Sequence, residues 1–238
     1  HRLPLGSRVF KGKAIANVVQ LANNEKVMSI LPVEEFSSSK FVVMLTANGI
    51  IKKTSLDSFA NPRTAGIIAL TTDLEDHVMD VKISDGESDV FIATKEGMSI
   101  RFNEADVRPM GRSARGVKAI TLGKSDTVVS MSIIEKNTKD TILMVTELGY
   151  GKRSTTDEYR VQSRGGVGII TQKTSDKVGF VVGASKVSET QELILSTDKG
   201  QVIRTRISEV SVIGRNTQGV RVMNLDSKEE KITGFAII

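Results

Sequence analysis

Four basic residues follow four glycines at one fixed distance along the chain, and this spacing is the strongest indication of a functional site in the sequence. Four positions after the glycines of TANGIIKKT, TKEGMSIRF, TELGYGKRS and TDKGQVIRT lie Lys53, Arg101, Arg153 and Arg204. Residues two apart on a strand share a face, and the residues two positions further on are all polar. The pattern therefore predicts a solvent-exposed basic face, to which Lys52, Lys152 and Arg206 add charge.

A second group of cations precedes another set of glycines, in NPRTAGIIAL, MGRSARGVKAI, QSRGGVGII and IGRNTQGVRVM. Four residues before the glycine stand Arg112, Arg164 and Arg215, with Arg8 in an earlier copy and Arg63 displaced by one. Further cations nearby are Lys11, Lys13, Arg115, Lys118 and Arg221. Lysine and arginine can simply protect edge strands from pairing with other chains. Two repeating groups, however, favour a belt of positive charge that binds a polyanion.

The elements that carry these cations repeat along the chain. The second set of glycines, Gly12, Gly66, Gly116, Gly168 and Gly219, recurs at intervals of 50 to 54 residues. Each glycine of the first set lies between two apolar, β-rich runs, which predicts four hairpins. A further apolar run in each unit, at 26–33, 77–83, 127–134 and 178–184, brings each repeat to about four short strands. Such repeats are typical of radial β architectures.

We therefore expect an all-β, propeller-like single domain over residues 1–238, with about five blades of four-stranded antiparallel sheets. The expected repeats span approximately 12–65, 66–115, 116–167 and 168–218, followed by a partial repeat at 219–238. Both ends of the chain fall within repeats. We therefore expect terminal strands to complete neighbouring blades, and the chain to be a piece of a longer subunit.

Composition excludes several kinds of site. The 238 residues contain no cysteine and two histidines, which excludes disulfides, thiolate metal sites and cysteine nucleophiles and fits a reducing cytosol. No apolar run reaches the length of a membrane span, and the amino terminus lacks the apolar core of a signal peptide. The acidic clusters lack the spacing of metal-binding loops and indicate solvated loops. We therefore predict no catalytic residue, no metal site and no membrane partner.

The scarcity of aromatic residues indicates which polyanion to expect. Single-stranded nucleic acid is held by stacking bases on aromatic rings, but the chain has no tryptophan and two tyrosines. A basic rim with small glycines instead suits a duplex backbone, which supplies affinity without sequence information. Bending about 40 base pairs through half a turn costs roughly 11 kcal/mol, which about ten phosphate contacts could offset. We therefore expect non-specific binding of duplex DNA by both groups of cations.

Three stretches, TANGIIKKT, YGKRS followed by EY, and VSVIGRNTQGVRVM, resemble the C-terminal domain of the bacterial DNA gyrase A protein, and the resemblance covers essentially the whole chain. It implies a β-pinwheel, a propeller-like disc of five or six blades that exchange strands with their neighbours. It also implies that the domain wraps DNA around a basic rim and presents a segment for ATP-driven strand passage, which introduces negative supercoils.

The same resemblance implies the cofactors and partners. The domain itself would hold no cofactor, whereas the whole enzyme would use ATP and Mg²⁺ in other domains. The partners would be double-stranded DNA, the remainder of the gyrase A protein and the gyrase B protein, in an A2B2 complex. This complex would act in the bacterial cytoplasm, at the nucleoid.

The chain departs from this family in its hallmark box, Q-R-R-G-G-K-G, which normally lies in the first blade. Residues 162–168, QSRGGVG, match five of its seven positions but lie in a late repeat. DNA binding is therefore expected more firmly than full wrapping. Two alternatives stay open, the homologous DNA-binding domain of topoisomerase IV, which wraps weakly, and a propeller whose rim binds acidic proteins. An enzyme with a central channel would need a convergent polar cluster, which the sequence does not show.

Overall fold

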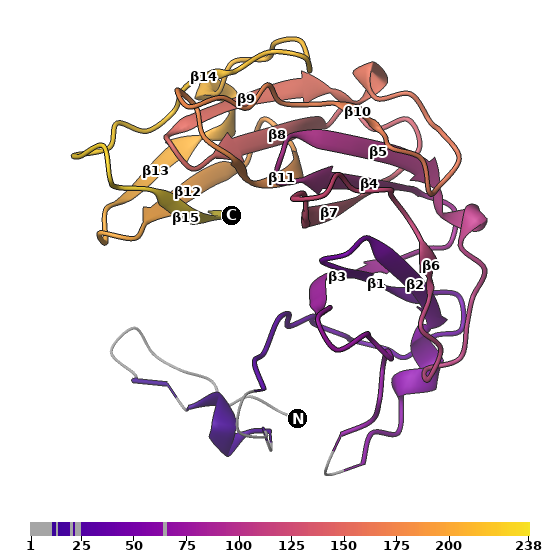
Figure 1. The fold of residues 1–238 in the computed structure, drawn as a ribbon. Coiled ribbons are helices and arrows are strands. Elements are labelled where there is room, and N and C mark those ends of the chain that lie inside the picture. Colours follow the sequence, from indigo (N-terminus) through magenta and orange to yellow (C-terminus); the bar gives the residue numbers. More distant parts are fainter. Residues whose placement is uncertain (1–10, 13, 20, 22–24, 64–65) are drawn as a thin grey trace.

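Short antiparallel β-sheets account for most of the ordered elements in the computed structural model of the chain (Figure 1). The structure describes residues 11–12, 14–19, 21, 25–63 and 66–238. These residues form four sheets, here called blades 1 to 4 in chain order, against about five blades expected for the whole chain. The blades follow one another along an arc, with blade 1 at one end and blade 4 at the other. The all-β class with four-stranded antiparallel sheets is confirmed.

Each blade is ordered from an inner to an outer edge. Blade 1 contains β3 (Val78–Ser84), β1 (Phe41–Thr46), β2 (Ile50–Ser55) and β6 (Val117–Lys118). Blade 2 contains β7 (Val128–Ile134), β4 (Asp89–Thr94), β5 (Met98–Asn103) and β10 (Ile169–Ile170). Blade 3 contains β11 (Val181–Val187), β8 (Thr141–Thr146), β9 (Tyr150–Thr155) and β14 (Val220–Arg221). Blade 4 contains β15 (Ile232–Ile237), β12 (Glu192–Thr197) and β13 (Val202–Arg206). The described residues give blade 4 no outer strand.

The outer strand of each complete blade comes from the next unit along the chain. In sequence β6 lies between β5 and β7 of blade 2, yet it pairs with β2 of blade 1 through Ile51↔Val117 and Ile50↔Lys118. Strands β10 and β14 join β5 and β9 in the same way. The expected exchange of strands between neighbouring blades is therefore confirmed. Residues 219–238, expected as a partial repeat, supply β14 to blade 3 and β15 to blade 4.

The four predicted hairpins are present as β1–β2, β4–β5, β8–β9 and β12–β13. A 3-10 turn follows each hairpin, namely η2 (Leu56–Phe59), η3 (Glu104–Asp106), η4 (Thr156–Glu158) and η5 (Ile207–Glu209). A further 3-10 turn, η1 (Ile15–Asn17), precedes blade 1.

Three of the four further apolar runs form the strands β3, β7 and β11, but the strand predicted from the first run is wrong. The apolar run at 26–33 forms no strand, and its residues Val27, Met28 and Ile30 are exposed. A strand needs a partner for its backbone N–H and carbonyl groups. Among the described residues no strand pairs with this run.

The hydrophobic core lies between the blades. Val43 and Leu45 of blade 1 pack in one cluster with Ile92 and Phe102 of blade 2. Further clusters join blade 2 to blade 3 and blade 3 to blade 4. Because each sheet buries its apolar faces only against its neighbours, the contacts that fasten one blade to the next decide the stability of the whole arc.

Candidate nucleic-acid interface

The first group of cations points into the interfaces between blades instead of toward solvent. Lys53 and Arg153 are 3% exposed, Lys52 and Lys152 are 0% exposed, and the Arg101 side chain is 15% exposed. The expectation of a solvent-exposed basic face is therefore wrong for these five residues. Alternating polar positions on a strand mark a face without apolar contacts, and a polar seam between two sheets produces the same pattern as a water-facing surface.

Three of these cations, Lys53, Arg101 and Arg153, donate hydrogen bonds to carbonyl oxygens at the 3-10 turn of the next blade. Lys53 Nζ donates to the first residue of η3 at 2.8 Å. Arg101 Nη1 donates to the first residue of η4 at 2.8 Å. Arg153 Nε donates to the carbonyl of Val210, directly after η5, at 2.8 Å. The cations at this position therefore give carbonyls at these short turns a charged donor from the preceding blade, and they connect each blade to the next.

Arg204 occupies the same position in blade 4 and lies in a different environment. Its side chain is 63% exposed, and its Nε donates to Glu192 of its own blade at 2.7 Å. In the described residues no 3-10 turn of a further blade covers it. Burial of the basic side chain at this repeat position therefore depends on a neighbouring blade and not on the strand that carries the residue.

Lys52 and Lys152 hold the loops that precede the exchanged strands. Lys152 Nζ donates to the carbonyl oxygens of Gly214, at 3.0 Å, and Arg215, and to the Thr217 hydroxyl at 3.1 Å. Lys52 Nζ donates to the carbonyls of Ala69, at 2.7 Å, and Arg112. Burial lowers the pKa of Lys152 to about 8; Glu158 opposes this shift and the positive charge of Arg215 adds to it. Burial likewise lowers the pKa of Lys52.

Two arginines of the second group connect neighbouring outer strands. Arg164 Nη1 donates to the carbonyl of Lys118 in β6 at 2.9 Å, and Arg215 Nη1 donates to the carbonyl of Ile170 in β10. Both arginines are half-buried. A guanidinium carries more N–H donors than these bonds use. The two side chains can therefore join the outer strands and still offer donors to an anion.

The glycine four residues after Arg112, Arg164 and Arg215 lets the loop lie directly on the hairpin strand. Gly116, Gly168 and Gly219 have φ values of 98°, 77° and 81°. A Cβ atom there would lie 2.5, 2.2 and 2.8 Å from a backbone carbonyl oxygen of β2, β5 and β9 respectively. Only glycine combines a positive φ with so close an approach. The fixed spacing between arginine and glycine therefore follows from the way the exchanged strand joins its blade.

Several predicted site residues remain accessible. Those that are exposed are Lys11, Arg63, Arg115, Lys118, Arg204, Arg206 and Arg221, and Arg112 is half-buried. Lys118 and Arg221 lie on β6 and β14, the outermost strands of their blades. The guanidinium of Arg221 lies 4.7 Å from the ring centre of Tyr150 and donates to its hydroxyl. Arg115 pairs with Asp73. The predicted residues Arg8 and Lys13 lie outside the described residues.

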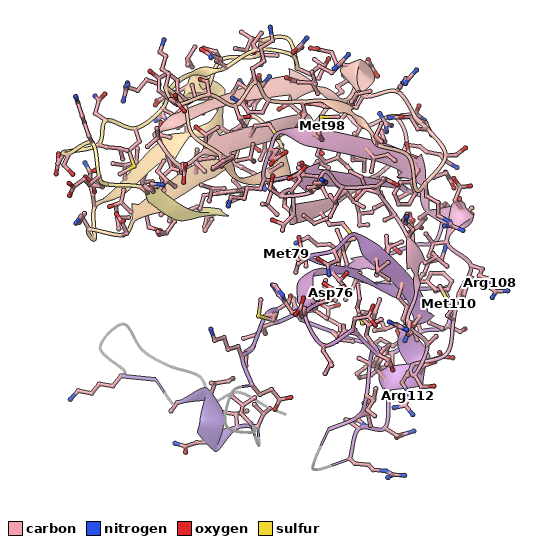
Figure 2. The ribbon with its side chains drawn as sticks, viewed as in Figure 1. Asp76, Met79, Met98, Arg108, Met110 and Arg112 are labelled. Carbon is pink, nitrogen blue, oxygen red and sulfur yellow. The ribbon has the colours of Figure 1, made fainter. Side chains whose placement is uncertain are left out.

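Two exposed arginines, Arg108 and Arg160, were missed by the sequence pattern. Each stands seven residues after a buried member of the first group, in a stretch that runs beside β2 or β5. Figure 2 shows Arg108 projecting from the outer side of the arc, whereas Met79 lies on its inner side. The 52-residue interval between the two arginines matches the repeat. The signal was incomplete because the equivalent residues of blades 1 and 4 are Ala60 and Ser211.

The described residues contain no group of three or more histidine, cysteine, aspartate and glutamate side chains that could hold a metal ion. Within the same part of the chain, no helix combines the length and the apolar character needed to cross a membrane. The notable electrostatic feature is therefore the set of cations on the outer strands and their loops.

Comparison with known proteins identifies the repeats. A family model described as the DNA gyrase C-terminal domain, a beta-propeller, matches residues 40–85, 88–135, 140–188 and 191–238. Each matched range begins at a hairpin and ends with an inner strand, so the four ranges follow blades 1 to 4.

Curated relatives agree with this match. The DNA gyrase A protein of Lawsonia intracellularis is 44% identical over 227 residues, covering 95% of this chain and 28% of the relative. Its counterpart in Salmonella typhimurium is 42% identical over 235 residues, covering 99% and 26%. The chain thus spans about a quarter of the length of these relatives.

Two solved structures share the fold. A DNA gyrase A C-terminal domain superposes with a TM-score of 0.85 at 27% identity, covering 95% of this chain and 75% of that chain. The C-terminal domain of a DNA topoisomerase IV superposes with a TM-score of 0.87 at 22% identity, covering 95% and 70%, a likeness that shows the fold alone. The strand-exchanged blades, the four matched repeats and these relatives show that the chain belongs to the DNA gyrase A C-terminal domain family.

Proposed function

We propose that the chain binds duplex DNA without sequence preference along the outer side of the arc and bends the duplex around it. The observation that carries this proposal is the division between the two groups of cations. The buried group fastens the blades, while the second group lies on the exchanged strands and in the loops that precede them. Phosphate contacts from such side chains supply affinity that depends on salt and not on sequence.

The curvature of the arc gives these contacts a common direction. Successive blades present Arg112, Arg164 and Arg215 from equivalent loops, and the exposed Arg108 and Arg160 stand beside the first two blades. With Lys118 and Arg221 on the outermost strands, the available cations approach the roughly ten contacts that would offset the cost of bending a duplex through half a turn. Because the loops and strands that carry these cations are held by strand exchange, little ordering of the backbone is needed on binding.

We further infer that the chain is the DNA-wrapping part of a gyrase A protein. The named relatives are gyrase A proteins, and the chain covers their C-terminal domain family over four repeats. In this proposal the domain presents a DNA segment to the remainder of the gyrase A protein and to the gyrase B protein, in an A2B2 complex in the cytoplasm. ATP and Mg²⁺ would act in other domains during strand passage, and this domain would carry no catalytic residue or cofactor.

A salt series of mobility shifts with duplexes of unrelated sequence tests DNA binding. We expect affinity to fall with a log-log slope of about 0.9 per phosphate neutralised. Replacing Arg108 and Arg160 with glutamine should lower the magnitude of that slope by about 0.9 for each arginine, equally for all sequences. Replacing Lys136 and Lys139, exposed in the loop between β7 and β8, provides the matched control and should leave the slope unchanged. Absence of binding at low salt would contradict the proposal.

Two further measurements separate the alternatives. Nicked circles are closed by ligase in the presence of the chain, and the linking number of the product is measured. It should shift if the domain wraps DNA as expected for gyrase. It should hardly shift if the domain wraps weakly, as in the topoisomerase IV alternative. Competition with an acidic polypeptide of matched charge tests the protein-binding alternative. If the polypeptide displaces duplex DNA at equal charge concentration, the rim is a protein-binding surface.

A further inference from the structure

Lys52 and Lys152 are the most unusual side chains in the described chain, because both are lysines with no exposed surface. A lysine is almost never fully buried unless its ammonium is paired. Both stand three residues after the hairpin glycine, where blades 2 and 4 have Ile100 and Ile203. An apolar residue therefore fits this strand position, and the lysines need an explanation beyond packing.

The two ammonium groups share one equivalent acceptor, although Lys52 also donates to the carbonyl of Ala69, which lies before β3. Lys152 binds the carbonyl of Arg215, and Lys52 binds the carbonyl of Arg112. In both blades the buried ammonium therefore binds the backbone of the arginine that precedes the exchanged strand. Lys152 also binds Gly214 and Thr217 on either side of that arginine, so it fixes the whole turn.

Blade 2, which has isoleucine at this position, anchors its loop arginine differently. There the side chain of Arg164 itself donates twice, to the carbonyl of Asp106 at 3.0 Å and to that of Lys118 at 2.9 Å. The carbonyls of Gly165 and Gly166 turn toward Thr121, whose hydroxyl and N–H donate to them at 2.7 and 2.9 Å. Without a lysine, the guanidinium is used to hold the loop.

Where the lysine is present, the guanidinium makes fewer hydrogen bonds to the rest of the chain. Arg215 makes a single side-chain hydrogen bond, to Ile170, and in the described residues Arg112 makes none. Their N–H donors thus remain available, while their backbones are held by a buried ammonium. Such preorganisation reduces the cost of ordering a side chain when it binds.

We propose that Lys152, and Lys52 in blade 1, are positioning residues that hold Arg215 and Arg112 with their guanidinium groups directed at the DNA backbone. This inference rests on the proposed DNA binding. The lysines touch no DNA, and each acts only through the arginine whose carbonyl it binds.

A double-mutant cycle on the 238-residue chain tests the proposal through duplex affinity at low salt. The variants are Lys152→Met, Arg215→Gln and their combination, and the control cycle combines Lys152→Met with Arg160→Gln. Arg215→Gln and Lys152→Met should each weaken binding about threefold to fivefold, the order of one phosphate contact. With Arg215→Gln already present, Lys152→Met should weaken binding no further, whereas with Arg160→Gln the two factors should multiply.

Each outcome of this cycle decides something. If Lys152→Met and Arg215→Gln multiply, or if either has no effect, the positioning role is wrong although DNA binding stands. If the unchanged chain does not bind duplex DNA, the proposed function itself fails. Circular dichroism identifies a variant that does not fold, and the Lys52→Met and Arg112→Gln cycle in blade 1 then replaces it with the same expectations.

The pH dependence of duplex affinity gives a second test. A lysine that only stabilised the fold would not change this dependence. Because burial brings the pKa of Lys152 to about 8, affinity of the unchanged chain should fall between about pH 7 and pH 9 as the ammonium loses its charge. The charged groups that act on Lys152 are Glu158 from η4 and Arg215 from the loop that precedes β14. Lys152→Met should lack this component of the pH dependence. Identical pH profiles for both proteins would overturn the positioning role.

Discussion

At the scale of single residues, one basic position in the repeat serves as a fastener or as surface charge according to what covers it. Arg153 donates into the next blade and is buried, while Arg204 at the same place in its repeat is exposed and pairs with Glu192. A buried hydrogen-bonded charge is costly to remove because its acceptors stay behind without water, whereas an exposed ion pair contributes little.

Replacing Arg153 with methionine should therefore lower the free energy of unfolding by roughly 2–4 kcal/mol, because the carbonyls of Ser208 and Val210 lose their donor. Arg204→Met is the matched control and should change it by less than about 0.5 kcal/mol. Urea denaturation followed by circular dichroism measures both. Equal effects of the two substitutions would contradict the assignment of the buried cations to the interfaces between blades.

Gly168 allows a second test at this scale. Its φ of 77° and the 2.2 Å separation between an added Cβ and the Ser99 carbonyl oxygen leave no room for alanine. Gly168→Ala should lower the free energy of unfolding by about 2 kcal/mol or more. Gly111→Ala should have a far smaller effect, since nothing lies within 4 Å of a Cβ there. Thermal unfolding of the two variants compares them directly.

At the scale of elements, the 3-10 turns are the parts that each blade presents to its predecessor. The carboxyl group of Glu104, at the start of η3, is buried and accepts a hydrogen bond from the Ser88 N–H at 3.2 Å. Burial raises the pKa of this carboxyl above its ordinary value of 4.5, with nearby hydrogen bonds and Lys53 opposing the shift. The seam between blades 1 and 2 therefore carries a titrating group.

The sign of its effect on stability follows from linkage. Because the pKa of Glu104 is higher in the folded chain than in the unfolded one, its contribution to stability is fully present below about pH 4.5 and is lost as pH rises through the folded value. The difference in free energy of unfolding between the unchanged chain and Glu104→Gln should therefore favour the unchanged chain more at about pH 4 than at about pH 7. Urea titrations across this range measure it, and a difference that stays constant with pH would exclude a titrating Glu104.

At the scale of the whole molecule, the blades form a series in which each depends on the next. Blades 1 to 3 receive an outer strand, while in the described residues blade 4 receives none. In blade 3 the N–H of Arg153 donates across the outer edge to the Ser211 carbonyl at 2.8 Å. Arg204 has the equivalent position in β13, which in the described residues is an edge strand, and Val202 of that strand is exposed.

Hydrogen exchange should reveal this gradient. Under native conditions the amide of Arg204 should exchange orders of magnitude faster than that of Arg153, because only the latter is protected by a neighbouring stretch of chain. Mass spectrometry of peptides from β9 and β13 measures the difference. Comparable protection of both would mean that the edge of β13 is covered in solution.

The repeat, the four hairpins and the glycine that joins each exchanged strand to its blade could all be predicted from the sequence, because turns, alternation and backbone conformation are local properties. The same reasoning placed Arg112, Arg164 and Arg215 in equivalent loops. The internal position of Lys53, Arg101 and Arg153, by contrast, is a property of the tertiary structure. A strand shows which residues share a face but not what lies against that face, and here a neighbouring blade lies there, turning an expected DNA-binding surface into the seam that holds the blades together.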